Sequence, residues 1–114
     1  MLPQKNRIPR KDFPGHKVQG FRVYFPFFTA VFYKPGKEVS MSRASVVVSK
    51  KTAKSAVERN TLRRRFYDLL APFFREAVEV TTVVIYPKAD AQKAEFSLLK
   101  REIEKSFKQA KLIK

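Results

Sequence analysis

The residues that could do chemistry in this chain gather in one segment, SKKTAKSAVERNTLRRRFYDLL (49–70). Ala56, Asn60, Arg63 and Tyr67 follow one another there at spacings of four, three and four, so on a helix they form a single stripe. Arginine binds phosphates through paired hydrogen bonds, asparagine offers a donor and an acceptor to a base or ribose hydroxyl, and tyrosine can stack on a base. The stripe therefore predicts RNA binding.

Further basic residues surround this stripe, and Ala56 leaves room for an RNA strand to approach the helix backbone. Arg64 lies at the margin of the stripe, and Arg59 lies near its boundary with the apolar face of the helix. The predicted RNA-binding residues are Lys50, Lys51, Lys54, Ala56, Arg59, Asn60, Arg63, Arg64 and Tyr67.

Residue types that support hydrolysis are sparse. The chain has no cysteine, and its single histidine, His16, stands beside Pro14-Gly15 in a turn-forming context. The ten acidic residues form no cluster of the kind that a two-metal nuclease uses. We therefore expect no catalytic residue and no metal site in the protein itself.

The charge balance supports a polyanionic partner. Lys and Arg number 25 against 10 Asp and Glu, which gives a net charge of +15, and neutralised phosphates release condensed counterions. A merely solvated basic helix face is the alternative, but only Glu58 and Asp68 offset the charge of the helix. No apolar stretch approaches the ~20 residues of a membrane span, and the N-terminus lacks a signal-peptide core, so we expect a cytoplasmic protein without a membrane partner.

The sequence predicts strands on both sides of the basic segment. The 114 residues suit one domain, 1–114, in which residues 1–20 are a basic, proline-broken and extended arm. Residues 21–33 are aromatic and β-branched and predict a strand interrupted or bulged at Pro26. Residues 44–49 and 80–86 predict two further, buried strands.

Two helices complete the prediction. The first runs from about Ala56 to Leu70, with Thr52 or Ser55 as its cap and Pro72 ending or kinking it. Its core-facing stripe is Leu62, Phe66, Leu69, Leu70 and Phe73, and the second helix carries Phe96, Leu99, Ile103 and Phe107. Strands, helix, strand and helix predict an α+β domain, a small mixed sheet packed by both helices.

The basic segment resembles the signature of the bacterial ribonuclease P protein subunit. Ser49-Lys50-Lys51, a spacer, Ala56-Val57-Glu58-Arg59-Asn60 and Arg63-Arg64 are similar to that family's RNR motif. The likeness extends along the chain, through Leu2-Pro3, Asn6-Arg7, Lys11-Asp12-Phe13, residues 26–33, Val83-Val84-Ile85 and Phe96-x-x-Leu99. Thr61 and Tyr67 stand where the family usually has basic residues.

The resemblance implies a fold similar to a ribosomal-protein domain, with a left-handed β-α-β crossover through the RNR helix. It implies a partner RNA that cleaves the 5′ leader from precursor tRNA and holds Mg²⁺, so that no cofactor binds the protein alone and no small molecule or further protein is needed. It also implies a cleft for the single-stranded leader, lined by aromatic residues. The stacking candidates are Phe13, Phe27 and Phe28, and Tyr24 is a further aromatic residue that could stack on leader bases.

Other function classes stay open at this point. A ribosomal protein or assembly factor would share the charge and the size and could share the fold, although the ordered match around Arg59-Asn60 argues against it. A stand-alone nuclease would cleave RNA without a partner RNA. A DNA-binding module is disfavoured because the sequence has no helix-turn-helix or zinc-finger pattern.

Overall fold

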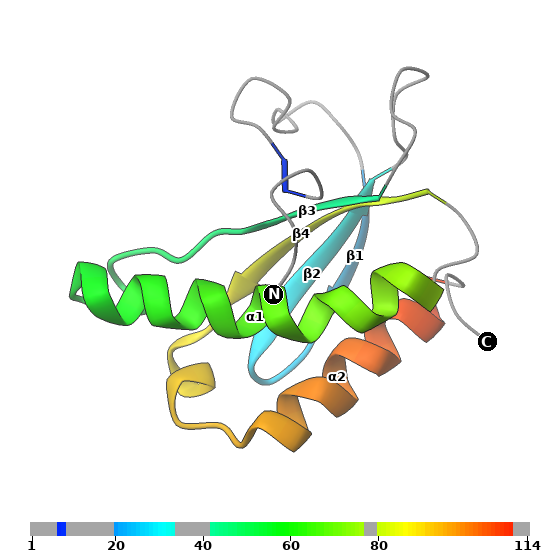
Figure 1. The fold of residues 1–114 in the computed structure, drawn as a ribbon. Coiled ribbons are helices and arrows are strands. Elements are labelled where there is room, and N and C mark those ends of the chain that lie inside the picture. Colours follow the sequence, from blue (N-terminus) through cyan, green and yellow to red (C-terminus); the bar gives the residue numbers. More distant parts are fainter. Residues whose placement is uncertain (1–6, 9–19, 34–41, 77–79, 111–114) are drawn as a thin grey trace.

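The computed structural model describes residues 7–8, 20–33, 42–76 and 80–110 (Figure 1). The elements in chain order are β1 (Phe21–Tyr24), β2 (Phe28–Tyr33), β3 (Arg43–Val46), α1 (Ala56–Glu76), β4 (Thr82–Pro87), the short 3₁₀ helix η3 (Ala89–Gln92) and α2 (Phe96–Gln109).

The four strands form one mixed sheet in the order β1-β2-β4-β3. β2 pairs antiparallel with both β1 and β4, whereas β3 runs parallel to β4. Both helices cover the same face of this sheet (Figure 1). Arg7 makes an isolated parallel bridge to Ala44, and the Ile8 N–H donates to the Ala44 carbonyl at 2.8 Å, so residues 7 and 8 contact β3.

The connection from β3 through α1 to β4 has an unusual hand. In Figure 1 the helices lie in front of the sheet, β3 and β4 both run from right to left, and β3 lies above β4. When the molecule is turned so that these two strands point up, β4 therefore lies to the left of β3. The crossover is therefore left-handed, as the family resemblance implies, although such connections are right-handed in nearly all sheets.

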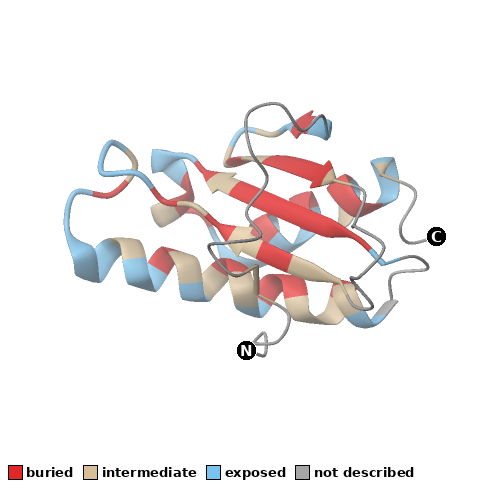
Figure 2. Ribbon diagram, turned by 90° about the horizontal axis from the view of Figure 1, so that it is seen from above, coloured by how far each residue is buried: buried red, intermediate tan, exposed pale blue. Residues whose placement is uncertain are grey.

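The core lies between the sheet and the two helices. Alternation along the strands turns residues such as Phe28, Phe32 and Ile85 toward the helices, and the central strands are buried along most of their length (Figure 2). The rings of Phe28 and Phe66 meet edge to face at 5.7 Å, and those of Phe32 and Phe107 do so at 5.4 Å. These contacts fix both helices against the sheet.

The predicted single strand over residues 21–33 is instead a hairpin. The chain bends at Pro26 and Phe27, and the Phe25 N–H donates to the Phe28 carbonyl at 2.9 Å. Proline suits such a bend because its fixed φ favours a turn. Lys88 holds the bend, because its N–H donates to the Phe27 carbonyl at 2.8 Å and its ammonium donates to the Phe25 carbonyl at 2.6 Å.

Two predictions about the helices need correction. α1 does not end at Leu70 but continues through Pro72 to Glu76. Proline removes one backbone hydrogen bond, yet the buried side chains of Leu70 and Phe73 anchor the helix on both sides of it. Phe96 was expected on the apolar face of α2, but it lies at the first position of that helix and is 50% exposed.

Candidate nucleic-acid interface

The first turn of α1 is fixed by a reciprocal pair of hydrogen bonds. The Glu58 N–H donates to the Ser55 hydroxyl at 3.0 Å, and the Ser55 N–H donates to the Glu58 carboxylate at 3.3 Å. This capping box satisfies N–H groups that a helix start otherwise leaves unpaired. Ser55 rather than Thr52 is therefore the cap, and the start of the helix at Ala56 sets the direction of every later side chain.

α1 has one buried and one basic side, as its spacing predicts. The five core-stripe residues are Leu62, Phe66, Leu69, Leu70 and Phe73, all buried. Beside them lies the basic flank, which we define as Ala56, Asn60, Arg63 and Arg64. Arg63 is half-buried and the other three are exposed. The Arg63 guanidinium donates to the Asn60 amide oxygen, so these two predicted site residues lie in direct contact.

The segment 49–54, which we call the lysine loop, precedes α1 and carries exposed positive charge. Its lysines are Lys50, Lys51 and Lys54. Thr52 ties this loop to two other elements, because its hydroxyl donates to the Pro87 carbonyl at 3.2 Å and its carbonyl accepts from the Gln92 side chain at 2.6 Å. The lysine loop is therefore held at the end of β4 and at η3.

Arg59 lies at the boundary between the basic flank and the core stripe, as predicted, but its guanidinium is directed at the protein backbone. Its guanidinium Nη1 donates to the Ala53 carbonyl at 3.0 Å and to the Lys54 carbonyl at 2.9 Å, and the side chain is half-buried. Two of its hydrogen bonds are thus directed at the protein backbone. Arg59 joins α1 to the lysine loop, and it reaches RNA less freely than the exposed Arg64.

Tyr67 lies on the same side of α1, but its ring is already engaged. Its hydroxyl accepts a hydrogen bond from the Val46 N–H at 3.2 Å, and the Arg7 guanidinium lies 4.4 Å from the ring centre. A cation over an aromatic ring is attracted by the electrons of its face. In this conformation Tyr67 supports β3 and Arg7 rather than presenting a free ring to a base.

Of the three phenylalanines predicted to stack on RNA, the structure places Phe27 and Phe28. Phe13 lies outside the described residues. Phe28 is fully buried, and its ring packs on Phe25 at 5.1 Å and on Phe66, so it belongs to the core and a base cannot reach it. Phe27 is half-buried in the hairpin bend, beside the exposed Leu98 at the start of α2.

The sheet face opposite the helices carries Tyr24, which the sequence offers as a further stacking residue, together with residues that the sequence prediction did not name. Because side chains alternate, Arg22 and Tyr24 point away from Val23 and the core, and the register aligns Tyr24 with Thr29 and Tyr86. Tyr24 is 70% exposed. We call Arg22, Tyr24, Tyr33 and Tyr86 the outer aromatic face. The signal in the sequence is the strand alternation in Phe21–Tyr24, which puts Arg22 and Tyr24 on the same face of the sheet.

The electrostatics of Tyr86 show that this face is a local cluster. Burial raises the pKa of the Tyr86 hydroxyl above its ordinary value, the neighbouring Tyr33 raises it further, and the positive charge of Arg22 lowers it. All three side chains are therefore close enough to interact. Arginine beside tyrosine rings is the combination that single-stranded nucleic acids use for phosphate contact and stacking.

The described residues contain neither a cluster of metal ligands nor a helix suited to crossing a membrane. Within them, no group of three or more His, Asp or Glu side chains is placed so that it could hold a metal ion. In the same parts of the chain, no helix combines the length and apolarity needed to cross a membrane.

Comparison of the sequence with family models and of the structure with solved structures gives the same family. The family model described as Ribonuclease P matches residues 2–111. A mutant of the Staphylococcus aureus RNase P protein, described as defective in mRNA degradation, superimposes with a TM-score of 0.79 at 21% identity over 96% of this chain and 92% of that chain. The RNase P protein from Thermotoga maritima gives a TM-score of 0.67 at 20% identity, over 79% of this chain and 83% of that chain.

These structural matches establish the fold, and no curated protein sequence gives a significant match. The family model carries the assignment, because it extends over nearly all of the 114 residues and includes the basic flank, the lysine loop and the outer aromatic face. The chain belongs to the ribonuclease P protein family.

Proposed function

We propose that this chain is the protein subunit of ribonuclease P and that it binds the catalytic RNA through the basic flank and the lysine loop. The observation that carries the proposal is the contact between Asn60 and Arg63 on the exposed side of α1. It places an amide and a guanidinium side by side, and together they can bind a phosphate and a base or ribose hydroxyl. The net charge of +15 supports the same partner.

The outer aromatic face is the surface that best suits the single-stranded 5′ leader of precursor tRNA. Tyr24 offers an exposed ring, Tyr33 and Tyr86 add half-buried rings beside it, and Arg22 offers a charge for the backbone. Stacking on an aromatic ring contributes ~1–3 kcal/mol per base and tolerates any base. Such tolerance suits a leader whose sequence differs from one tRNA to the next.

In this proposal the RNA subunit carries out the hydrolysis of the phosphodiester bond and holds the Mg²⁺ ions. The protein contributes binding and positioning, and no side chain of the chain is assigned a catalytic role. The proposed partners are the catalytic RNA and precursor tRNA, in the cytoplasm, with no small-molecule substrate and no additional protein.

Reconstitution tests the proposal. The purified protein is combined with a bacterial ribonuclease P RNA at low magnesium, and release of the 5′ leader from precursor tRNA is followed. We expect the protein to stimulate cleavage and to be inactive without the RNA. Binding without stimulation would favour a structural RNA-binding protein, and cleavage by the protein alone would favour a stand-alone nuclease.

A further inference from the structure

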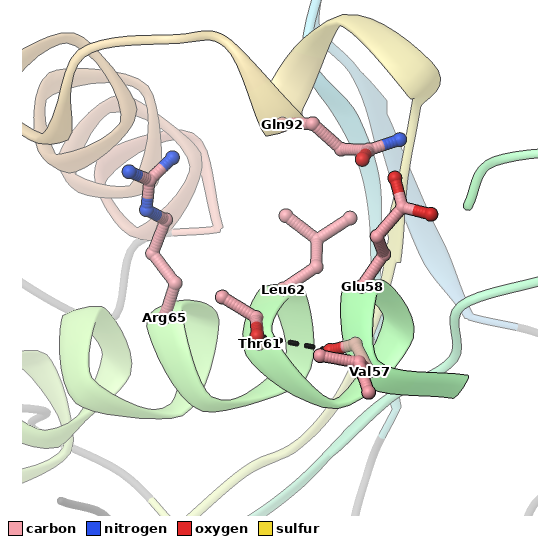
Figure 3. Close-up of a pocket in the computed structure, with 6 residues that line it drawn as sticks. All are labelled: Val57, Glu58, Thr61, Leu62, Arg65 and Gln92. Atoms are coloured by element: carbon pink, nitrogen blue, oxygen red, sulfur yellow. Dashed lines mark hydrogen bonds between the residues drawn. The ribbon is translucent and has the colours of Figure 1, made fainter. Parts of the chain in front are cut away.

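A small pocket lies on the side of α1 away from β3. It has a volume of about 180 Å³ and is lined by Val57, Glu58, Thr61, Leu62, Arg65 and Gln92. Figure 3 shows Leu62 between Arg65 on one side and Glu58 and Gln92 on the other. Val57 is 75% exposed and gives the pocket an apolar rim that is open to solvent.

The polar groups around the pocket are held in place by other parts of the protein. The Arg65 guanidinium donates to the Ala91 and Ala94 carbonyls at 3.3 and 3.1 Å. The Gln92 amide nitrogen donates to the Thr52 carbonyl, so the amide oxygen of Gln92 remains as an acceptor. The pocket is therefore preformed, which lowers the entropic cost of filling it.

The size and shape of the pocket suit a single ring. Drug-sized ligands occupy pockets of roughly 300–1,000 Å³, whereas a cavity of about 150 Å³ accommodates one benzene ring. Val57, Leu62 and the methyl group of Thr61 provide an apolar surface for such a ring. A planar group with polar edges would fill the pocket and meet the fixed polar groups at its sides.

The surrounding charge identifies the kind of molecule that carries the ring. Arg64 follows Thr61 by one turn of α1 and lies exposed next to it, and Arg65 forms one wall of the pocket. Cations beside an apolar, ring-sized pocket are complementary to a nucleotide, which has a base and a phosphate. We propose that the pocket receives one unpaired nucleobase of the RNA that α1 binds, an inference that rests on the function proposed above.

The free polar atoms favour one base over the others. The Gln92 amide oxygen is an acceptor, and the Glu58 carboxylate keeps accepting capacity beyond its single bond to the Ser55 N–H. Two adjacent acceptors match two adjacent donors, and guanine presents these through its N1–H and its exocyclic amino group. The pocket is therefore expected to prefer guanine to uracil, cytosine or adenine.

Site-directed crosslinking tests the location. The photoreactive residue p-benzoylphenylalanine replaces Val57, which is exposed, and the protein is irradiated in complex with ribonuclease P RNA and precursor tRNA. We expect a crosslink to one unpaired nucleotide, a guanosine. The same residue in place of Leu98, which is 37% exposed at the start of α2, is the matched control and should not give that crosslink.

Filling the pocket tests its contribution to affinity. In Thr61→Phe an aromatic ring is added at an exposed helical position, and we expect RNA affinity to fall about tenfold, a typical loss for one stacked base. The slope of log K against log salt should not change, because no phosphate contact is lost. Ser97→Phe, at an exposed position of α2, should leave affinity unchanged.

The outcomes separate this inference from the proposed function. If the protein binds and stimulates the RNA but Val57 crosslinks only to paired nucleotides or to nothing, the nucleobase inference is wrong and the subunit assignment stands. Full affinity in Thr61→Phe would also overturn it, as would a crosslink to a protein instead of RNA. If the unmodified protein fails to bind ribonuclease P RNA at all, the proposed function itself fails.

Discussion

The guanidinium of Arg63 donates a hydrogen bond to the side-chain amide oxygen of Asn60, one turn earlier on the exposed side of α1. This bond restricts both side chains, so less rotational entropy remains to be lost when RNA binds. It also leaves the amide N–H groups of Asn60 and the remaining guanidinium N–H groups of Arg63 as donors toward solvent. The pair therefore forms a donor surface that suits phosphate.

Removing two arginines from this surface should weaken RNA binding in a salt-dependent way. In Arg63→Ala with Arg64→Ala, we expect the slope of log K against log salt to fall by roughly one unit per lost phosphate contact. Lys100→Ala with Arg101→Ala removes the same charge from exposed positions of α2 and is the control. Equal slope changes in the two double variants would show that only net charge matters.

Removing a ring from the outer aromatic face should affect the leader selectively. Tyr24→Ala removes a ring that is 70% exposed, and we expect affinity for precursor tRNA to fall by roughly five- to a hundredfold if that ring stacks on a base. Affinity for mature tRNA, which has no leader, should stay constant in a holoenzyme binding assay. Phe96→Ala removes another half-exposed ring, on α2, and should change neither affinity.

Arg59 should contribute to stability as well as to binding. Arg59→Ala removes both hydrogen bonds to the lysine loop, and hydrogen bonds to charged groups contribute about 1.5–3 kcal/mol each when buried and less when half-exposed. We expect the free energy of unfolding to fall by about 1–2 kcal/mol and the backbone amides of the lysine loop to exchange faster. Arg64→Ala should change stability by less than about 0.5 kcal/mol. Unchanged exchange in Arg59→Ala would contradict the positioning role.

The Tyr67 hydroxyl should stabilise the edge of the sheet. Tyr67→Phe keeps the ring under Arg7 but leaves the Val46 N–H without its acceptor, which costs about 1–2 kcal/mol in urea unfolding. Tyr24→Phe, at a site where the ring is mostly exposed, should unfold like the parent. If the two variants have equal stability, the 3.2 Å contact contributes nothing.

The stability of the protein should depend on the ionisation of Glu102. This residue is buried, and one carboxylate oxygen has no partner among the described residues. Burial raises the pKa of Glu102, while the Phe27 N–H and the charges of Lys105 and Lys88 lower it by less. The folded state therefore holds the proton more tightly than the unfolded state, and stability should fall as pH rises from the ordinary glutamate pKa through the raised one.

Glu102→Gln isolates this effect. The amide has nearly the same shape but carries no charge, so the fall in unfolding free energy across that pH range should disappear, and the variant should be the more stable form at neutral pH. Glu104→Gln, at a residue whose ion pair with Lys108 is partly exposed, should keep the parent pH dependence. A parent-like pH profile in Glu102→Gln would exclude Glu102 as the source.

The sequence predicted those features that depend on regular spacing. The core stripe of α1 and the stripe of Ala56, Asn60, Arg63 and Tyr67 beside it follow from 3.6 residues per turn, and the structure places both on the predicted sides of the helix. RNA binding by the second stripe stays a prediction. The strand at residues 44–49 is found, although it is shorter, because a short β-branched run needs little context. The family likeness along the chain agrees with the match of the family model to residues 2–111.

Features that depend on distant partners could not be predicted. Nothing in the spacing shows that Arg59 turns back to two loop carbonyls, or that Tyr67 meets Val46 and Arg7, because these contacts arise only when the elements pack. Phe28 was proposed for stacking because aromatic residues are equally suited to a core and to a binding face. Only the strand register decides between these roles, and it placed Phe28 inside.

The strand order has a consequence for synthesis on the ribosome. β4 lies between β2 and β3 but is made after both of them, so the two earlier strands flank a gap until β4 emerges. Until then α1 has only the β1-β2 hairpin against which to bury residues such as Phe66, and helices without a complete packing partner gain little stability on their own. We expect the nascent chain to acquire its rigid basic helix late, so the fixed arrangement of Asn60 and Arg63 forms only after β4 has been made.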